Sequence, residues 1–122
     1  MLYDGFEHRL GPLALDVGAV IFTNAQDVSA VLGQAHGWTI RLIADVDKAN
    51  AAYENAWSLI LRDAGCLVMT VCLVAEWLGL RACPLGLMGH SLSRALGFPG
   101  KRFKGVGAVQ VCSSANAAAT KL

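Results

Sequence analysis

The sequence predicts a small α+β domain that combines short strands with one long apolar helix. Its 122 residues suffice for one domain, and a composition of 55% hydrophobic and 16% charged residues excludes intrinsic disorder. Apolar, β-branched runs bounded by glycine or proline alternate with segments of helical periodicity. A chain of this length buries roughly two thirds of its unfolded surface, so the surplus of apolar residues indicates an interface, a ligand cavity or a membrane contact.

The N-terminal third predicts an arm, a strand, a helix and a second strand. Glycine and proline turn signals within residues 4–12 favour a hairpin-like or irregular arm. Residues 17–23 are apolar and β-branched, which predicts a strand. Asn24 has the chemistry of a helix cap, so we expect a helix over 25–34. Residues 38–44 alternate in polarity and predict the second strand.

The middle of the sequence predicts a short helix and a long one. Two early acids, Asp45 and Asp47, favour a helix that runs to residue 53. Residues 55–79 keep helical spacing of apolar side chains. Only 12 successive residues, 64–75, lack a charge there, whereas a membrane span needs about 20. We therefore expect a buried interface helix and no membrane contact.

The C-terminal part predicts two strands around a short helix. Residues 80–86 read as a strand that ends in a proline-glycine turn. Ser91 is expected to cap a helix over 91–96, and residues 103–112 form the last strand. The chain is thus predicted to be one domain, residues 1–112, followed by a flexible tail, residues 113–122.

Charge is distributed unevenly along the chain. Residues 1–80 carry a net charge of −5, whereas residues 81–122 carry six basic residues and no acid. An acid-free segment that still folds suits an anionic ligand or an acidic partner surface. The overall net charge of +1 gives no reason to expect a nucleic-acid partner.

The remaining chemistry-bearing residues indicate no metal or nucleophile site. The four cysteines, Cys66, Cys72, Cys83 and Cys112, have neither paired nor zinc-type spacing. With no secretory leader pattern at the start, they are expected to be free, buried thiols of a cytoplasmic protein. The P-loop, G-x-S-x-G and H-E-x-x-H patterns are absent from the sequence.

Two phrases of the sequence resemble a known family. Residues 76–86 read EWLGLRACPLG and residues 96–99 read LGFP, which is similar to the C-terminal half of nitroreductase-family flavoenzymes. The segments at 45–48, 53–55 and 63–65 resemble the azoline-oxidising (SagB-type) dehydrogenase branch. The family is usually about twice this length, so the resemblance implies half of a nitroreductase-like fold.

The resemblance implies that FMN is the cofactor and indicates which residues would bind it. The turn Pro84, Leu85, Gly86 and Leu87 would face the flavin ring, and Lys101, Arg102 and Lys104 would pair with its phosphate. Of the Lys-Tyr pair associated with catalysis in that branch, Ala52-Tyr53 keeps only the tyrosine. An ordinary loop, a solvated basic turn and a packing tyrosine are the alternative interpretations.

The resemblance therefore implies an FMN-dependent oxidoreductase that acts on a small molecule or a modified peptide. We expect it to work as a homodimer or as a hetero-oligomer with a flavoenzyme partner, with the helix at 55–78 in the interface. The alternative is a non-catalytic accessory subunit that completes a partner flavoenzyme.

Overall fold

The computed structural model describes residues 1–4, 6–12, 17–34, 36–87, 90–98 and 100–113. The elements follow the order β1 (Leu2–Asp4), β2 (Arg9–Gly11), α1 (Val17–Leu32), β3 (Trp38–Asp45), α2 (Val46–Ala52), α3 (Ala56–Trp77), β4 (Leu80–Leu85), α4 (His90–Ala95) and β5 (Phe103–Ser113). The predicted α+β class is confirmed. The predicted tail, apart from Ser113 at the end of β5, lies outside the described residues.

The main sheet has three antiparallel strands in the order β3-β5-β4. Arg41 on β3 pairs with Ala108 on β5, which pairs in turn with Leu85 on β4. The register between β3 and β5 shifts once, between Leu42 and Ile43. The strands β1 and β2 form a separate antiparallel hairpin, as expected for the N-terminal arm.

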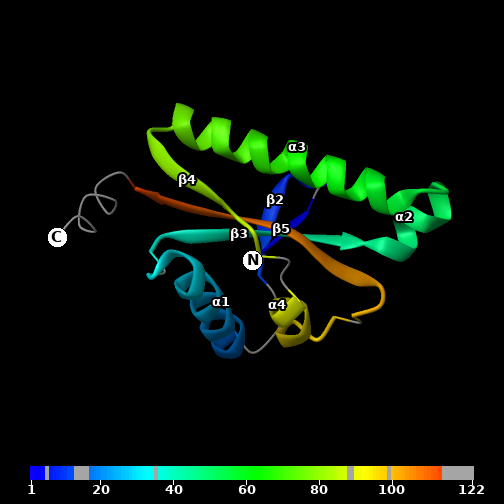
Figure 1. Cartoon of the computed structure of the whole chain (residues 1–122), viewed down its shortest axis with the longest axis horizontal. Coiled ribbons are helices and arrows are strands. Elements are labelled where there is room, and N and C mark those ends of the chain that lie inside the picture. Colours follow the sequence, from blue (N-terminus) through cyan, green and yellow to red (C-terminus); the bar gives the residue numbers. More distant parts are fainter. Residues whose placement is uncertain (5, 13–16, 35, 88–89, 99, 114–122) are drawn as a thin grey trace.

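Helices cover both faces of this sheet (Figure 1). On one face α3 packs on β4 and β5, with Val68 against the row of Leu42 and Gly107. On the other face α1 supplies Val28, which is fully buried in a cluster with Leu85 and Ala108. The helix α4 packs beside α1 and against β5.

Most of the elements expected from the sequence are confirmed. The predicted strands at 38–44, 80–86 and 103–112 correspond to β3, β4 and β5, and the predicted helices at 45–53 and 55–79 correspond to α2 and α3. Asp45 caps α2 by accepting a hydrogen bond from the backbone N–H of Lys48 at 3.3 Å. The early acids therefore act as their positions predict.

Two expectations for local structure are wrong. Residues 17–23 are not a strand but the first half of α1. Asn24 is internal to that helix and bonds Thr39 and Arg41 on β3, so tertiary contacts replace the predicted cap. Ser91 likewise lies inside α4, where its hydroxyl bonds Asp27 rather than the helix terminus. In both places a polar side chain of a type that favours helix caps instead forms a hydrogen bond with a residue of another helix or strand.

The expectation of buried thiols is also wrong. Cys66 and Cys83 are exposed, and Cys72 and Cys112 are half-buried; all four are free. The described core is small, because four of its nine buried apolar side chains are alanines. Many large apolar side chains consequently remain on the surface, Trp38, Met69, Leu73 and Trp77 among them.

The long helix α3 shows this surplus most clearly. Among the described helices it alone has the length and composition to cross a membrane, and only 11% of its most apolar stretch is buried by the chain. Its buried residues are Ala56, Ala64 and Ala75. The side that faces away from the sheet carries Met69, Leu73 and Trp77, which are 57%, 64% and 84% exposed. The described part of the chain therefore does not bury this helix, although the sequence predicts that it is buried in an interface.

Candidate functional site

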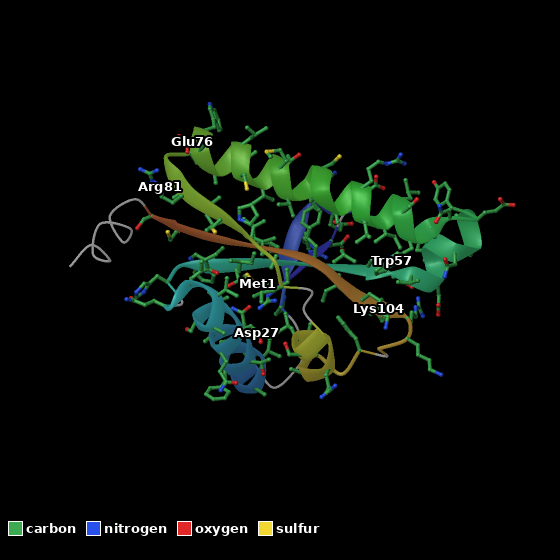
Figure 2. The ribbon with its side chains drawn as sticks, in the orientation of Figure 1. Met1, Asp27, Trp57, Glu76, Arg81 and Lys104 are labelled. Atoms are coloured by element: carbon green, nitrogen blue, oxygen red, sulfur yellow. The ribbon has the colours of Figure 1, made fainter. Side chains whose placement is uncertain are left out.

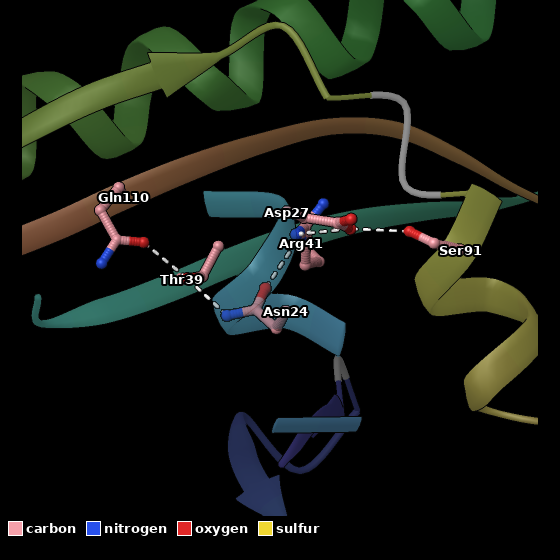
Figure 3. Close-up of polar contacts among 6 residues, drawn as sticks. All are labelled: Asn24, Asp27, Thr39, Arg41, Ser91 and Gln110. Atoms are coloured by element: carbon pink, nitrogen blue, oxygen red, sulfur yellow. Dashed lines mark hydrogen bonds and ion pairs between the residues drawn. The ribbon is translucent and has the colours of Figure 1, made fainter. Parts of the chain in front are cut away.

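A network of polar side chains lies between the sheet and α1 (Figure 3). Arg41 Nη2 on β3 lies 3.3 Å from Asp27 Oδ2 on α1, and Arg41 Nε donates to Asn24 Oδ1 at 2.9 Å. Ser91 on α4 donates to the same Asp27 oxygen at 2.7 Å. The network therefore ties β3, α1 and α4 together.

The same network continues across the sheet. Asn24 donates to Thr39 Oγ1 at 2.9 Å, and Thr39 donates to Gln110 Oε1 at 2.6 Å. Gln110 in turn donates to the carbonyl of His36. Since Gln110 is itself buried, these bonds satisfy a polar group that burial would otherwise destabilise.

Arg41 is the most strongly perturbed member of this network. Its side chain is only 8% exposed, and burial lowers its pKa, although Asp27 opposes that effect. The buried Nη1 atom has no hydrogen-bond partner. The carboxylate of Asp27 is partly exposed to solvent. It therefore offsets only part of the cost of burying the Arg41 guanidinium.

This network is not predicted from the sequence. Its only signal is the spacing of Asn24 and Asp27, which lie three residues apart and so share a helical face. The two residues share a face only if Asn24 lies inside the helix, whereas the sequence predicts a strand over 17–23 and a helix cap at Asn24. Apart from Arg41 Nη1, the donors and acceptors named above are used within the network, so we interpret it as a structural connection between elements rather than a reactive site.

The turn at residues 84–87, predicted to face a flavin ring, contains both exposed and buried residues. Pro84 and Gly86 are exposed, and a Cβ atom added at Gly86 would meet no heavy atom within 4 Å. The backbone at Gly86 is therefore open to a flat ligand. Leu85, in contrast, is buried against Val28 and Ala108, and Leu87 packs against the same cluster. Pro84 and Gly86 fit the predicted role, whereas Leu85 belongs to the core.

The predicted phosphate-binding residues precede or begin β5. Arg102 donates three hydrogen bonds to Asp45, from Nη2 to Oδ2 at 2.6 Å and from Nε to Oδ1 and Oδ2 at 3.0 and 3.1 Å. Its hydrogen bonds lower the pKa of Asp45, and the carboxylate raises the pKa of Arg102. The structure gives no ion pair between a described residue and Lys101 or Lys104. Lys104 lies at this end of the sheet (Figure 2), and both lysines are therefore available to meet an anion.

Tyr53 is the predicted catalytic residue. It follows α2 as its C-cap, with a backbone N–H that donates to the carbonyl of Ala49 at 3.0 Å. Its side chain is 57% exposed, so its position is compatible with contact to a ligand and does not resemble a core packing position.

The topology brings these segments toward one end of β5. Lys104 pairs with Ala44 near the end of β3, and α2, which leads to Tyr53, starts directly after that strand. The strand β4 runs toward the same end and stops at Leu85, opposite Ala108. From Ala108 to Lys104 is four residues, or roughly 13 Å along a strand. The exposed turn and the lysines thus adjoin the same strand, about 13 Å apart along it.

Comparison of the chain with models of known protein families, with curated proteins and with solved structures gives no match. The resemblance to nitroreductases thus depends on the sequence phrases alone. Among the described residues, no three histidine, cysteine, aspartate or glutamate side chains lie together in a group that could hold a metal ion.

Proposed function

We propose that this chain is an FMN-dependent oxidoreductase of nitroreductase-like fold, or one subunit of such an enzyme. The observation that carries the proposal is that both segments assigned to the flavin by resemblance adjoin β5, and each leaves binding groups free. Gly86 offers open backbone, and Lys101 and Lys104 are unpaired among the described residues. When bound, the flavin would supply hydride chemistry, and the chain would hold and orient it.

In this proposal Lys101 and Lys104 hold the phosphate, with Arg102 assisting from its pair with Asp45. A flavin phosphate carries about two negative charges at neutral pH. Cations at the surface attract it with an energy that salt screens strongly. Tyr53 would take a proton from the substrate, which we infer to be a small molecule or a modified peptide. We place this activity in the cytoplasm.

The proposal is tested by titrating the purified protein with FMN and following flavin fluorescence. The double variant Arg102→Ala, Lys104→Ala is expected to weaken binding by at least tenfold at low salt, and by less at high salt. A matched control, Arg9→Ala with Arg81→Ala, removes the same charge from exposed positions outside the site. Equal affinity in both double variants would contradict the proposed phosphate site.

The second candidate is a non-catalytic subunit that completes a partner flavoenzyme. It is favoured by the small core, by the exposed apolar face of α3 and by the engagement of Arg102 with Asp45. Under this alternative the chain alone would not bind FMN. Under the leading proposal we expect α3 to pair with a second copy or with a flavoenzyme subunit through its outer face.

A further inference from the structure

We infer that α3 binds the α3 of a second copy of this chain, in an antiparallel pair whose two-fold axis passes at Met69. The inference rests on the expectation, made with the proposed function, that α3 pairs through its outer face, and it selects the partner. Figure 1 shows α3 as an outer layer, with the sheet on one side and no described element on the other. That outer side carries the exposed apolar residues Met69, Leu73 and Trp77.

The charges of α3 are arranged symmetrically about Met69. Arg62 and Glu76 each lie seven residues from Met69, which is almost two helical turns, so the three side chains follow one line along the helix. Both charged residues are exposed, and neither forms an ion pair with a described residue. Asp63, the third charged residue of α3, lies about 100° round the helix from Arg62.

This line of side chains is complementary to itself when it is reversed. In an antiparallel pair centred on Met69, Arg62 of each copy lies opposite Glu76 of the other, so both contacts are attractive. A parallel pair would place like charges opposite each other, and a lipid surface would bury both charges without partners. A different polypeptide would need matching charges of its own, whereas a second copy supplies them at the required spacing.

Gly65 gives an independent reason for this arrangement. It lies inside α3, where glycine destabilises a helix relative to alanine. A Cβ atom at Gly65 would meet no heavy atom within 4 Å, so the described part of the chain does not require glycine there. Gly65 precedes Met69 by four residues and Leu73 follows it by four. The two-fold axis therefore places Leu73 of each copy over Gly65 of the other, where the missing side chain leaves room for it.

Charge reversal in the full chain tests the pairing, with the dimer dissociation constant measured by sedimentation equilibrium. Arg62→Glu and Glu76→Arg should each weaken the dimer at least tenfold, because each variant places like charges opposite each other twice. The double variant Arg62→Glu, Glu76→Arg restores both attractive contacts and should return to within threefold of the parent chain. Arg94→Glu makes the same reversal at an exposed position of α4, across the sheet from α3, and should change the constant by less than twofold.

Two further variants test the register. Gly65→Leu fills the space assigned to Leu73 and should weaken the dimer at least tenfold without lowering the free energy of unfolding, because leucine favours a helix more than glycine does. Gly100→Leu is the control, since it makes the same change at an open position outside α3.

A cross-link locates the axis. The background is the chain with its four cysteines replaced by serine. There, Met69→Cys should give a disulfide-linked dimer on air oxidation, because the axis brings residue 69 of both copies together. Leu73→Cys in the same background should not, because it faces Gly65 of the other copy.

Three results would overturn the inference. The first is a parent chain that stays monomeric at tens of micromolar. The second is a double charge variant no tighter than the two single variants, and the third is a monomer that binds phosphatidylcholine vesicles through α3. FMN affinity is measured separately on the same proteins. A monomer that binds FMN would overturn this inference and leave the proposed function in place, whereas a dimer with the expected charge dependence that binds no FMN would do the reverse.

Discussion

Arg41 and Asp27 form an ion pair between β3 and α1, with 3.3 Å between Nη2 and Oδ2. The arginine side chain is 8% exposed and the aspartate 24%. Asp27 accepts a further bond from Ser91, so one carboxylate joins three elements. Asp27 neutralises the nearly buried charge of Arg41 only in part. Loss of this carboxylate is therefore expected to destabilise the fold more than loss of one partner of a surface ion pair would.

Removal of Asp27 is therefore expected to destabilise the fold. Asp27→Ala leaves a nearly buried guanidinium without its counter-charge, which we expect to lower the free energy of unfolding by about 2–3 kcal/mol. Ser91→Ala removes one hydrogen bond and should cost about 1 kcal/mol. Urea denaturation measures both. A double variant, Asp27→Ala with Arg41→Met, should be more stable than Asp27→Ala alone; a less stable double variant would contradict the account.

This network also shows where sequence reasoning reached its limit. The strands β3, β4 and β5 and the helix α3 follow from local periodicity, which the structure retains. The first half of α1 does not follow from local periodicity, because its β-branched residues favour a strand locally. In the folded chain, Asn24 bonds Thr39 and Asp27 bonds Arg41, and both partners lie far along the sequence. A single sequence does not reveal such pairings, since they depend on tertiary contacts.

The environment of the candidate site residues could be expected from the sequence only at some positions. The exposed turn at Gly86 and the free lysines agree with a binding role that can be expected from residue type and position. The burial of Leu85 could not be foreseen, because it depends on Val28 of α1. The pairing of Arg102 with Asp45 likewise joins residues 57 positions apart.

The pair formed by Arg102 and Asp45 predicts a pH dependence. Hydrogen bonds from Arg102 are the main reason that the pKa of Asp45 lies below its usual value of 3.8. A carboxyl group with a lowered pKa in the folded state stabilises the fold above its unfolded pKa, and this contribution is lost as the pH falls through the folded pKa.

Arg102→Gln should therefore raise the pKa of Asp45 toward its usual value, measured by NMR titration of the carboxyl carbon. The stability difference between the variant and the parent chain should be present at neutral pH, begin to fall near the usual carboxyl pKa of about 4, and vanish only below the lowered pKa that Asp45 has in the folded parent chain. Lys101→Gln is the control, because it removes a neighbouring positive charge that does not contribute to the lowered pKa of Asp45. An unchanged Asp45 titration in Arg102→Gln would contradict the assignment.

Gly37 is expected to tolerate no side chain. It adopts φ +83°, and a Cβ atom there would collide with the carbonyl oxygen of Val111 and lie 2.8 Å from Cys112 Cβ. Gly33 has a similar φ of +75° but open space around it. Gly33→Ala should thus cost about 1 kcal/mol from backbone strain alone.

Gly37→Ala adds the steric collision to the same strain and should cost clearly more, about 3 kcal/mol or above. Thermal or urea denaturation of the two variants compares them directly. Because both residues share the left-handed conformation, the difference isolates the contact between Gly37 and β5. Equal losses would mean that Gly37 does not approach Val111 as described.

The outer face of α3 predicts self-association or a partner. Leu73 lies in the middle of its exposed apolar stripe, between Met69 and Trp77. Leu73→Lys should weaken any assembly through this face at least tenfold, as judged by light scattering after size-exclusion chromatography. Phe22→Lys places the same charge on an equally exposed residue of α1 and serves as control. A soluble monomer at micromolar concentration, or partition into detergent micelles with no defined oligomer, would contradict the interface.

Tyr53 carries the last prediction. A free tyrosine titrates near pH ~10, so it needs a nearby cation to act as a base at neutral pH. Lys48 lies five positions earlier on α2, which places it on a different helical face. The exposure of Tyr53 leaves its hydroxyl open to a ligand instead. In the FMN-loaded protein, Tyr53→Phe should keep flavin affinity and the free energy of unfolding while turnover falls by about 10²-fold or more. Tyr3→Phe, at the other tyrosine of the chain, should leave turnover unchanged. Full turnover in Tyr53→Phe would assign this side chain a surface role and remove it from the proposed chemistry.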